Sequence, residues 1–129
     1  MLTNEHLEIL KNIGTCMIAT CGDDKLPHCT IVEPSEYSKE QIIIPIVQMV
    51  KSVKNMKENA NIFLHFYYVD ENDSELNTQY KISAVAKLEF SGEDFERVKH
   101  YEETEVLPEG FYVNGIVKAE IKNIEICVG

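Results

Sequence analysis

The residues best suited to chemistry in this chain form a short polar segment that follows the apolar run at positions 42–47. Lys51 and Ser52 lie where a helix is expected to begin, and Asn55 follows Lys51 by about one helical turn. The first N–H groups of a helix have no partner inside it, and that end carries partial positive charge. An ammonium, a hydroxyl and an amide beside such an end are typical of a phosphate site. The segment predicts such a site, although a solvated lysine face is the commoner explanation of a lysine run.

The overall charge makes this segment an exception. The 129 residues include 12 Lys+Arg and 22 Asp+Glu, which gives a formal net charge of −10. Binding to nucleic acid or to an anionic membrane surface depends on positive charge, so neither is expected as a partner. Lys51, Lys54 and Lys57 are spaced about 60° apart around a helix. An anionic ligand is therefore expected at this segment.

Other side chains give weaker signals. A hairpin that turns at positions 24–25 pairs Thr20 with Cys29 and brings Cys21 and His28 nearby. Neighbouring strand positions point to opposite faces and a fourth ligand is missing, so no metal site is predicted. The sequence has neither the G-x-S-x-G elbow of a hydrolase nor a glycine-rich nucleotide motif. No catalytic residue is therefore predicted.

The cysteines and the N-terminal segment bear on the compartment. The four cysteines show no C-x-x-C spacing, and the first residues lack the apolar core of a signal peptide. The longest apolar run is far too short to span a bilayer. We therefore expect reduced thiols, a cytoplasmic location and no membrane partner.

The elements that must position these residues are mostly strands. Hydrophobic spacing predicts one domain, residues 1–129, with a helix from a Thr3 cap to a Gly14 stop. Strands are expected at 15–21, 26–33, 41–47, 61–69, 80–90 and 117–126, and further helices at 49–58 and 93–101. The last strand changes phase, which indicates a bulge near Asn123. Because the strands cluster rather than alternate with helices, the order favours a mainly β protein, an antiparallel barrel with peripheral helices.

The chain resembles the FMN-binding split-barrel superfamily, relatives of pyridoxamine 5'-phosphate oxidase, and most of all its very small bacterial FMN-binding proteins. Four stretches carry the resemblance: Ile18-Ala19-Thr20, Pro27-His28, Ile44-Pro45-Ile46 and Met49-x-Lys51-Ser52-x-x-Asn55. It implies a six-stranded antiparallel split barrel in each chain, a homodimer, and FMN in the cleft between the chains.

Carried over by position, the resemblance implies a cofactor-binding role for ten residues. Lys51 and Ser52 would hold the FMN phosphate, and Asn55 would support that loop. Pro45-Ile46-Val47-Gln48 would pass along the flavin with backbone groups facing the ring, and Thr30-Ile31-Val32 would form the other wall. His28 could hydrogen-bond the flavin or be an ordinary strand histidine.

This sequence departs from its small relatives near the expected ring. Ile31 and Glu33 stand where a relative presents an asparagine and an aromatic residue, and Val47-Gln48 replaces a glycine-rich loop. Two functions remain open. One is a flavoprotein, either an FMN-dependent oxidoreductase or an electron carrier for an unknown small molecule. The other is a flavin-less dimeric barrel that serves as a binding or interaction module.

Overall fold

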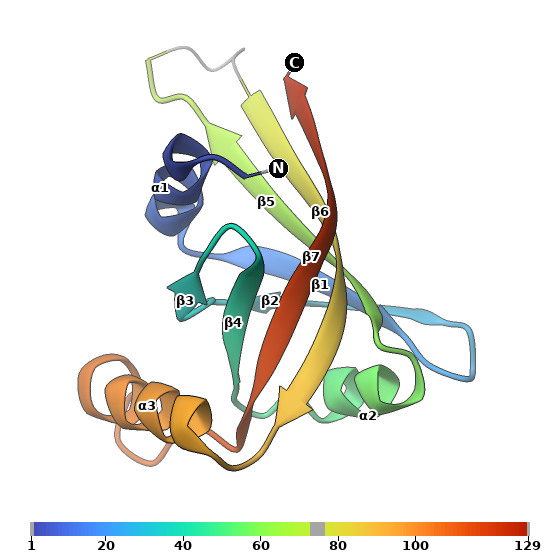
Figure 1. Ribbon diagram of the computed structural model, residues 1–129, viewed down its shortest axis with the longest axis vertical. Helices are drawn as coiled ribbons and strands as arrows, with labels where there is room; N and C mark the ends of the chain where they lie inside the picture. The colour runs from blue at the N-terminus through green and yellow to red at the C-terminus, as the bar shows by residue number, and fades with distance from the viewer. Residues whose placement is uncertain (1, 73–76, 129) are drawn as a thin grey trace.

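The computed structural model describes residues 2–72 and 77–128, which fold into a curved antiparallel sheet with helices around it (Figure 1). The elements are α1 (Asn4–Ile13), β1 (Cys16–Cys21), β2 (Pro27–Val32), β3 (Glu36–Tyr37), β4 (Gln41–Ile46), α2 (Val50–Glu58), β5 (Asn61–Val69), β6 (Asn77–Glu89), α3 (Glu93–Tyr101), the π-helix η1 (Glu102–Val106) and β7 (Gly115–Val128). Within the described residues, no helix combines the length and apolar character needed to cross a membrane.

The strand order is β2-β1-β5-β6-β7-β4-β3, and every neighbouring pair is antiparallel. This confirms the mainly β antiparallel split barrel predicted from the sequence. The described residues form seven strands instead of six, because Glu36 and Tyr37 pair with Ile43 and Ile42 as the additional strand β3. So short a strand forms by pairing with β4 across a short turn and has no hydrophobic alternation of its own.

Local signals behave as expected at α1 and at the bulge. The Thr3 side chain accepts a hydrogen bond from the His6 backbone N–H, and Gly14 ends the helix with φ 78°. In the β6–β7 pairing, Ser83 lies opposite Asn123 whereas Ala84 lies opposite Ile121. The residue between the last two partners is therefore extra, which confirms a bulge beside Asn123.

The β1–β2 hairpin differs from its predicted register by one residue. Thr20 pairs with His28 and not with Cys29, so the predicted pairing is wrong. The turn is the five-residue loop 22–26, in which the Lys25 N–H donates to the Gly22 carbonyl at 3.0 Å. The Asp23 N–H donates to Glu58 Oε1 of α2 at 2.8 Å. A contact with a distant helix thus favours the longer loop.

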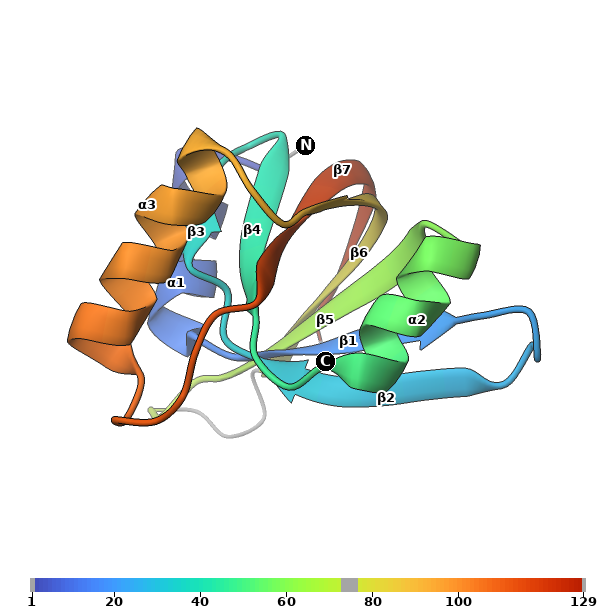
Figure 2. The same ribbon diagram turned by 90° about the horizontal axis from the view of Figure 1, so that it is seen from below.

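Strand β4 is buried on both faces because it lies between two hydrophobic cores. Ile42, Ile44 and Ile46 belong to the main core inside the curved sheet, together with Leu10, Ile18, Leu64, Phe66 and Ile82. Ile43 points the other way and packs with Phe95 and Val98 of α3. Seen from below, α3 and α2 lie on opposite sides of β4, and β1 and β2 cross beneath it (Figure 2). The chain that leaves β4 therefore runs between two helical regions.

Candidate functional site

Helix α2 begins without a side-chain cap. Its N-cap residue Met49 makes no side-chain hydrogen bond, and the first turn contains no acidic residue. The first helical hydrogen bond runs from the Val53 N–H to the Met49 carbonyl at 2.9 Å. The preceding N–H groups of the helix therefore remain available, at the end where the helix dipole is positive.

Ser52 lies in this first turn and is 1% exposed. Its Oγ has no hydrogen-bond partner among the residues that the structure describes. A buried hydroxyl without a partner costs free energy, so it is a group for which a ligand or an ordered water would be favourable. This hydroxyl, the uncapped helix end and the neighbouring Lys51 form a set that fits a phosphate group.

Lys51 already has an acidic neighbour. Its Nζ lies 3.0 Å from Asp24 Oδ2 in the hairpin loop, and its side chain is 42% exposed. The pKa of Asp24 is lowered, first by the hydrogen bond from the Leu26 backbone N–H and then by Lys51. A phosphate that binds Lys51 would therefore share this ammonium with a carboxylate.

Asn55 fastens α2 to the barrel. Its side chain is fully buried, and Nδ2 donates to Thr20 Oγ1 at 3.1 Å. Its Oδ1 lies against Gly22, where an added Cβ would come within 2.6 Å of it. Asn55 therefore positions the beginning of α2 relative to β1 and the hairpin loop.

Two cavities flank the segment 45–49 that joins β4 to α2. The first, named the acidic pocket, has a volume of about 450 Å³ and is lined by Ile31, Val32, Glu33, Pro45, Val47, Met49, Glu102, Val106, Leu107 and Pro108. The second, named the lysine pocket, has a volume of about 390 Å³ and is lined by Ile46, Gln48, Met49, Val50, Val53, Lys54, Lys57, Phe90 and Asn114. Pro45 and Val47 thus face one cavity and Ile46 and Gln48 the other, while Met49 lines both.

The predicted site residues divide into groups. Ile31, Val32, Pro45 and Val47 come together in the acidic pocket, whereas Ile46 and Gln48 line the lysine pocket. Lys51, Ser52 and Asn55 lie on the parts of α2 that face the hairpin loop and the barrel. Thr30 is opposite Ile18 of β1 and lines neither cavity.

The three lysines of α2 do not act as one cluster. Lys51 pairs with Asp24, whereas Lys54 and Lys57 line the lysine pocket. Lys57 Nζ lies 5.3 Å from the centre of the Phe90 ring, within the range of a cation–π contact. The lysine pocket therefore combines two ammonium groups with an apolar wall.

Glu102 is the residue in this region that sequence reasoning missed as a site residue. It is 5% exposed at the start of η1 and lines the acidic pocket. Burial raises the pKa of its carboxyl, the Ser35 hydrogen bond opposes that shift, and the charge of Glu33 adds to it. A usable signal was present, because Phe95, Val98 and Glu102 follow the helical spacing of a buried face.

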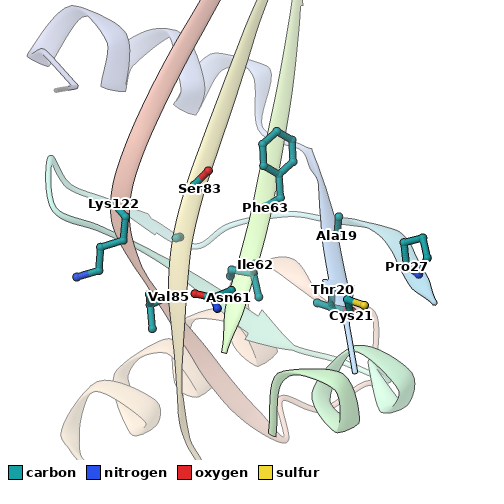
Figure 3. Close-up of a pocket in the computed structure, with 11 residues that line it drawn as sticks. Ala19, Thr20, Cys21, Pro27, Asn61, Ile62, Phe63, Ser83, Val85 and Lys122 are labelled. Carbon is teal, nitrogen blue, oxygen red and sulfur yellow. The ribbon is translucent and has the colours of Figure 1, made fainter. Parts of the chain in front are cut away.

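A third cavity, named the outer groove, lies on the outside of the sheet and has a volume of about 380 Å³. Figure 3 shows its wall, to which Ala19 and Cys21 of β1, Phe63 of β5 and Val85 of β6 contribute. None of the predicted cofactor-binding residues lines it. His28 is half-buried opposite Thr20 and lines none of these three cavities.

Comparison with solved structures identifies the fold. A point variant of HupZ from Group A Streptococcus matches with a TM-score of 0.80 and 16% identity over 98% of this chain and all of that one. An FMN-binding protein from Syntrophomonas wolfei gives 0.75 and 16% identity over 93% of this chain and 82% of that one. HutZ, the heme storage protein from Vibrio cholerae, gives 0.70 and 16% identity over 98% and 94%.

Among curated proteins, none has a sequence that matches this chain. A family model described as pyridoxamine 5'-phosphate oxidase matches residues 2–121, from before α1 into the last strand. The sheet topology and the solved structures agree with that match. The chain therefore belongs to the pyridoxamine 5'-phosphate oxidase family of FMN-binding split barrels.

Proposed function

We propose that this chain binds FMN, with the phosphate at the beginning of α2 and the ring along the segment that leads into it. The observation that carries the proposal is the uncapped helix end with the unpartnered, buried Ser52 hydroxyl beside Lys51. Backbone N–H groups, a cation and the helix dipole together favour a dianionic phosphate there. The Syntrophomonas wolfei protein of similar fold is described as FMN-binding, which supports this choice of ligand.

In this proposal each group has a distinct task. Lys51 and the free N–H groups of the first turn meet the phosphate first, because the Ser52 hydroxyl is enclosed between α2 and the barrel. Asn55 keeps that turn in place through Thr20. Pro45-Ile46-Val47-Gln48 runs along the ring, and Thr30-Ile31-Val32 provides the second wall, of which Ile31 and Val32 already share a cavity with Pro45.

When bound, the flavin would supply hydride or electron transfer, and the protein would supply orientation and a local field. We therefore propose a flavin-dependent oxidoreductase or electron carrier that works on a small molecule in the cytoplasm. The four free cysteines agree with such a reducing compartment.

We further propose that the working form is a homodimer with the flavin between the chains. Ile31 is 68% exposed on the outer side of β2, and the outer groove adds a second apolar surface. Apolar surfaces of this kind favour contact with another protein chain. Sedimentation of the protein with and without FMN measures the oligomeric state, and a monomer under both conditions would exclude the dimer.

Quenching of FMN fluorescence during titration with the protein tests the phosphate site. Replacing Lys51 and Ser52 by alanine removes charge-assisted bonds that contribute about 1.5–3 kcal/mol each, so losing both should raise Kd by about 100-fold or more. Lys11→Ala is the matched control, since Lys11 is likewise a helical lysine in an ion pair, in this case with Glu8 of its own helix. An unchanged Kd in the double variant would place the phosphate elsewhere.

The same titration separates the other interpretations. Wild-type protein that leaves FMN fluorescence unchanged would favour the flavin-less interaction module. Protein that takes up haem and ignores FMN would favour a function nearer to that described for HutZ. Absorption spectra of the purified protein distinguish these ligands directly.

A further inference from the structure

The acidic pocket has a composition that the proposed FMN site does not explain. Its walls are mostly apolar, and its only charged lining groups among the described residues are the carboxyls of Glu33 and Glu102. None of the ion pairs found in residues 2–72 and 77–128 includes either glutamate. The pocket therefore presents negative charge with no cation from the described part of the chain to balance it.

The two glutamates differ in their surroundings. Glu33 follows β2 and is exposed, whereas Glu102 is 5% exposed. Burial raises the pKa of the Glu102 carboxyl, because the charged form is poorly solvated there. A cation in the pocket would stabilise the charged carboxylate that burial destabilises, since an ion pair in a partly desolvated site is stronger than one in water.

The π-helix gives the pocket its shape. The Leu107 N–H donates to the Glu102 carbonyl at 2.7 Å, a bond that spans one residue more than an α-helical bond. This wider turn brings Glu102, Val106 and Leu107 to the same cavity. Single π-turns of this kind are frequent at functional sites.

We propose that the acidic pocket binds a small molecule with a protonated amine on an apolar body, and that Glu102 receives the ammonium group. The apolar part would lie against Val106, Leu107 and Pro108, beside the wall assigned to the flavin ring, and Glu33 would attract the cation at the mouth. This inference rests on the proposed function, because the pocket borders the segment assigned to the flavin ring and a bound amine is a substrate only if the flavin binds there. It names the class of substrate, whereas the binding itself does not require FMN.

The same charges discriminate against phosphorylated amines. A phosphate ester in this cavity would lie near two carboxylates, and no lysine or arginine of the described chain is among the lining residues. Like charges at short range disfavour binding. Pyridoxamine 5'-phosphate, the compound in the family's name, is therefore expected to bind here more weakly than an amine without a phosphate.

The probes are tryptamine, tryptophol and pyridoxamine 5'-phosphate, titrated separately into ¹⁵N-labelled protein and followed by the amide shifts of Val106 and Leu107. Tryptamine and tryptophol have the same ring and differ in an ammonium against a hydroxyl. We expect tryptamine to bind about tenfold or more tightly than tryptophol, as for a hydrogen bond to a charged group. We also expect it to bind more tightly than the phosphate ester.

Three variants locate the effect. Glu102→Gln keeps the shape and removes the charge, so the preference for tryptamine should fall to the few fold at most that Glu33 supplies. Glu33→Gln should reduce it by a few fold at most, because exposed charges contribute less. Glu105→Gln, an exposed position in the same π-helix, should leave it unchanged.

Equal affinity for tryptamine and tryptophol in wild-type protein would overturn the proposal, as would a preference that survives undiminished in Glu102→Gln. Repeating the titration with and without FMN separates the two proposals. An amine preference in a protein that does not bind FMN would support the amine subsite and exclude the proposed FMN function. FMN binding without any amine preference would support the proposed function and exclude the amine subsite.

Discussion

The acidic pocket and the lysine pocket differ in charge more than in size. Their volumes are about 450 and 390 Å³, and they share the segment 45–49 as a common wall. Among the described residues, the first is lined by Glu33 and Glu102 and by no basic residue, whereas the second is lined by Lys54 and Lys57 and by no acidic residue. Pro45 and Val47 face one cavity, and Ile46 and Gln48 face the other.

This difference shows how an acidic chain can keep positive charge concentrated in one place. The net charge of −10 is an average, and a single short segment is enough to separate two environments of opposite sign. A cofactor with an anionic phosphate and an uncharged ring suits such an arrangement, with the phosphate on the side of α2.

Gly22→Ala is expected to have the largest effect, and to act on the α2 side of the molecule while leaving the acidic pocket unchanged. The added Cβ would come within 2.5 Å of Glu58 Oε1 and 2.6 Å of Asn55 Oδ1, so these side chains, α2 or the hairpin must shift. We expect a loss of about 1–3 kcal/mol in the free energy of unfolding, measured with urea, as for other overpacked sites. Amine binding in the acidic pocket should not change, because that pocket is lined by neither α2 nor the hairpin loop.

A second substitution checks the cause. Glu58→Ala removes the nearer of the two clashing groups, so Gly22→Ala should cost less stability in that background than in the wild-type protein. A cost that is the same in both backgrounds would contradict the packing of loop 22–26 on α2.

Asp24→Asn should have a smaller effect, on the phosphate side alone. It removes the carboxylate that holds Lys51 but keeps the oxygen that accepts the Leu26 N–H. Exposed ion pairs contribute about 0.2–1 kcal/mol, so FMN affinity should rise by up to about fivefold in a fluorescence titration. Asp23→Asn is the matched control, since Asp23 takes part in none of the ion pairs between described residues. An affinity that falls would show that Asp24 supports the ligand instead of competing with it.

The smallest effect concerns pH and the acidic pocket. The folded protein raises the pKa of Glu102 above its ordinary value of 4.5, so the folded state binds this proton more tightly than the unfolded state. The contribution of Glu102 to the free energy of unfolding is therefore fully present below pH 4.5 and is lost as pH rises through the pKa of the folded state. Glu102→Gln should stabilise the protein at pH 7 relative to pH 4, as measured by thermal unfolding. A larger benefit at pH 4 would reverse the sign and exclude a raised pKa.

The sequence was sufficient for features that depend on local patterns. The six main strands, the three α-helices and the bulge beside Asn123 follow from hydrophobic spacing, and the structure confirms them. Thr3 and Gly14 also mark the ends of α1 correctly. Each of these signals comes from residues close together in the chain.

Features that depend on distant contacts could not be predicted. The hairpin register follows from a bond between Asp23 and Glu58, 35 residues apart. The partner of Lys51 is Asp24, 27 residues away. The phosphate role of Lys51 and Ser52 stays a prediction, and the structure adds the uncapped helix end that gives it a physical basis.

The odd length of loop 22–26 also constrains how this chain can change by insertion and deletion. Side chains alternate along β2, so gaining or losing one residue in the loop would move every β2 side chain to the opposite face unless the pairing readjusts. Ile31 would then enter the barrel and Val32 would face solvent. A change of two residues preserves the faces. Among relatives that keep this barrel, the loop should therefore vary in steps of two, and an alignment with a single-residue gap there should be corrected elsewhere in the hairpin.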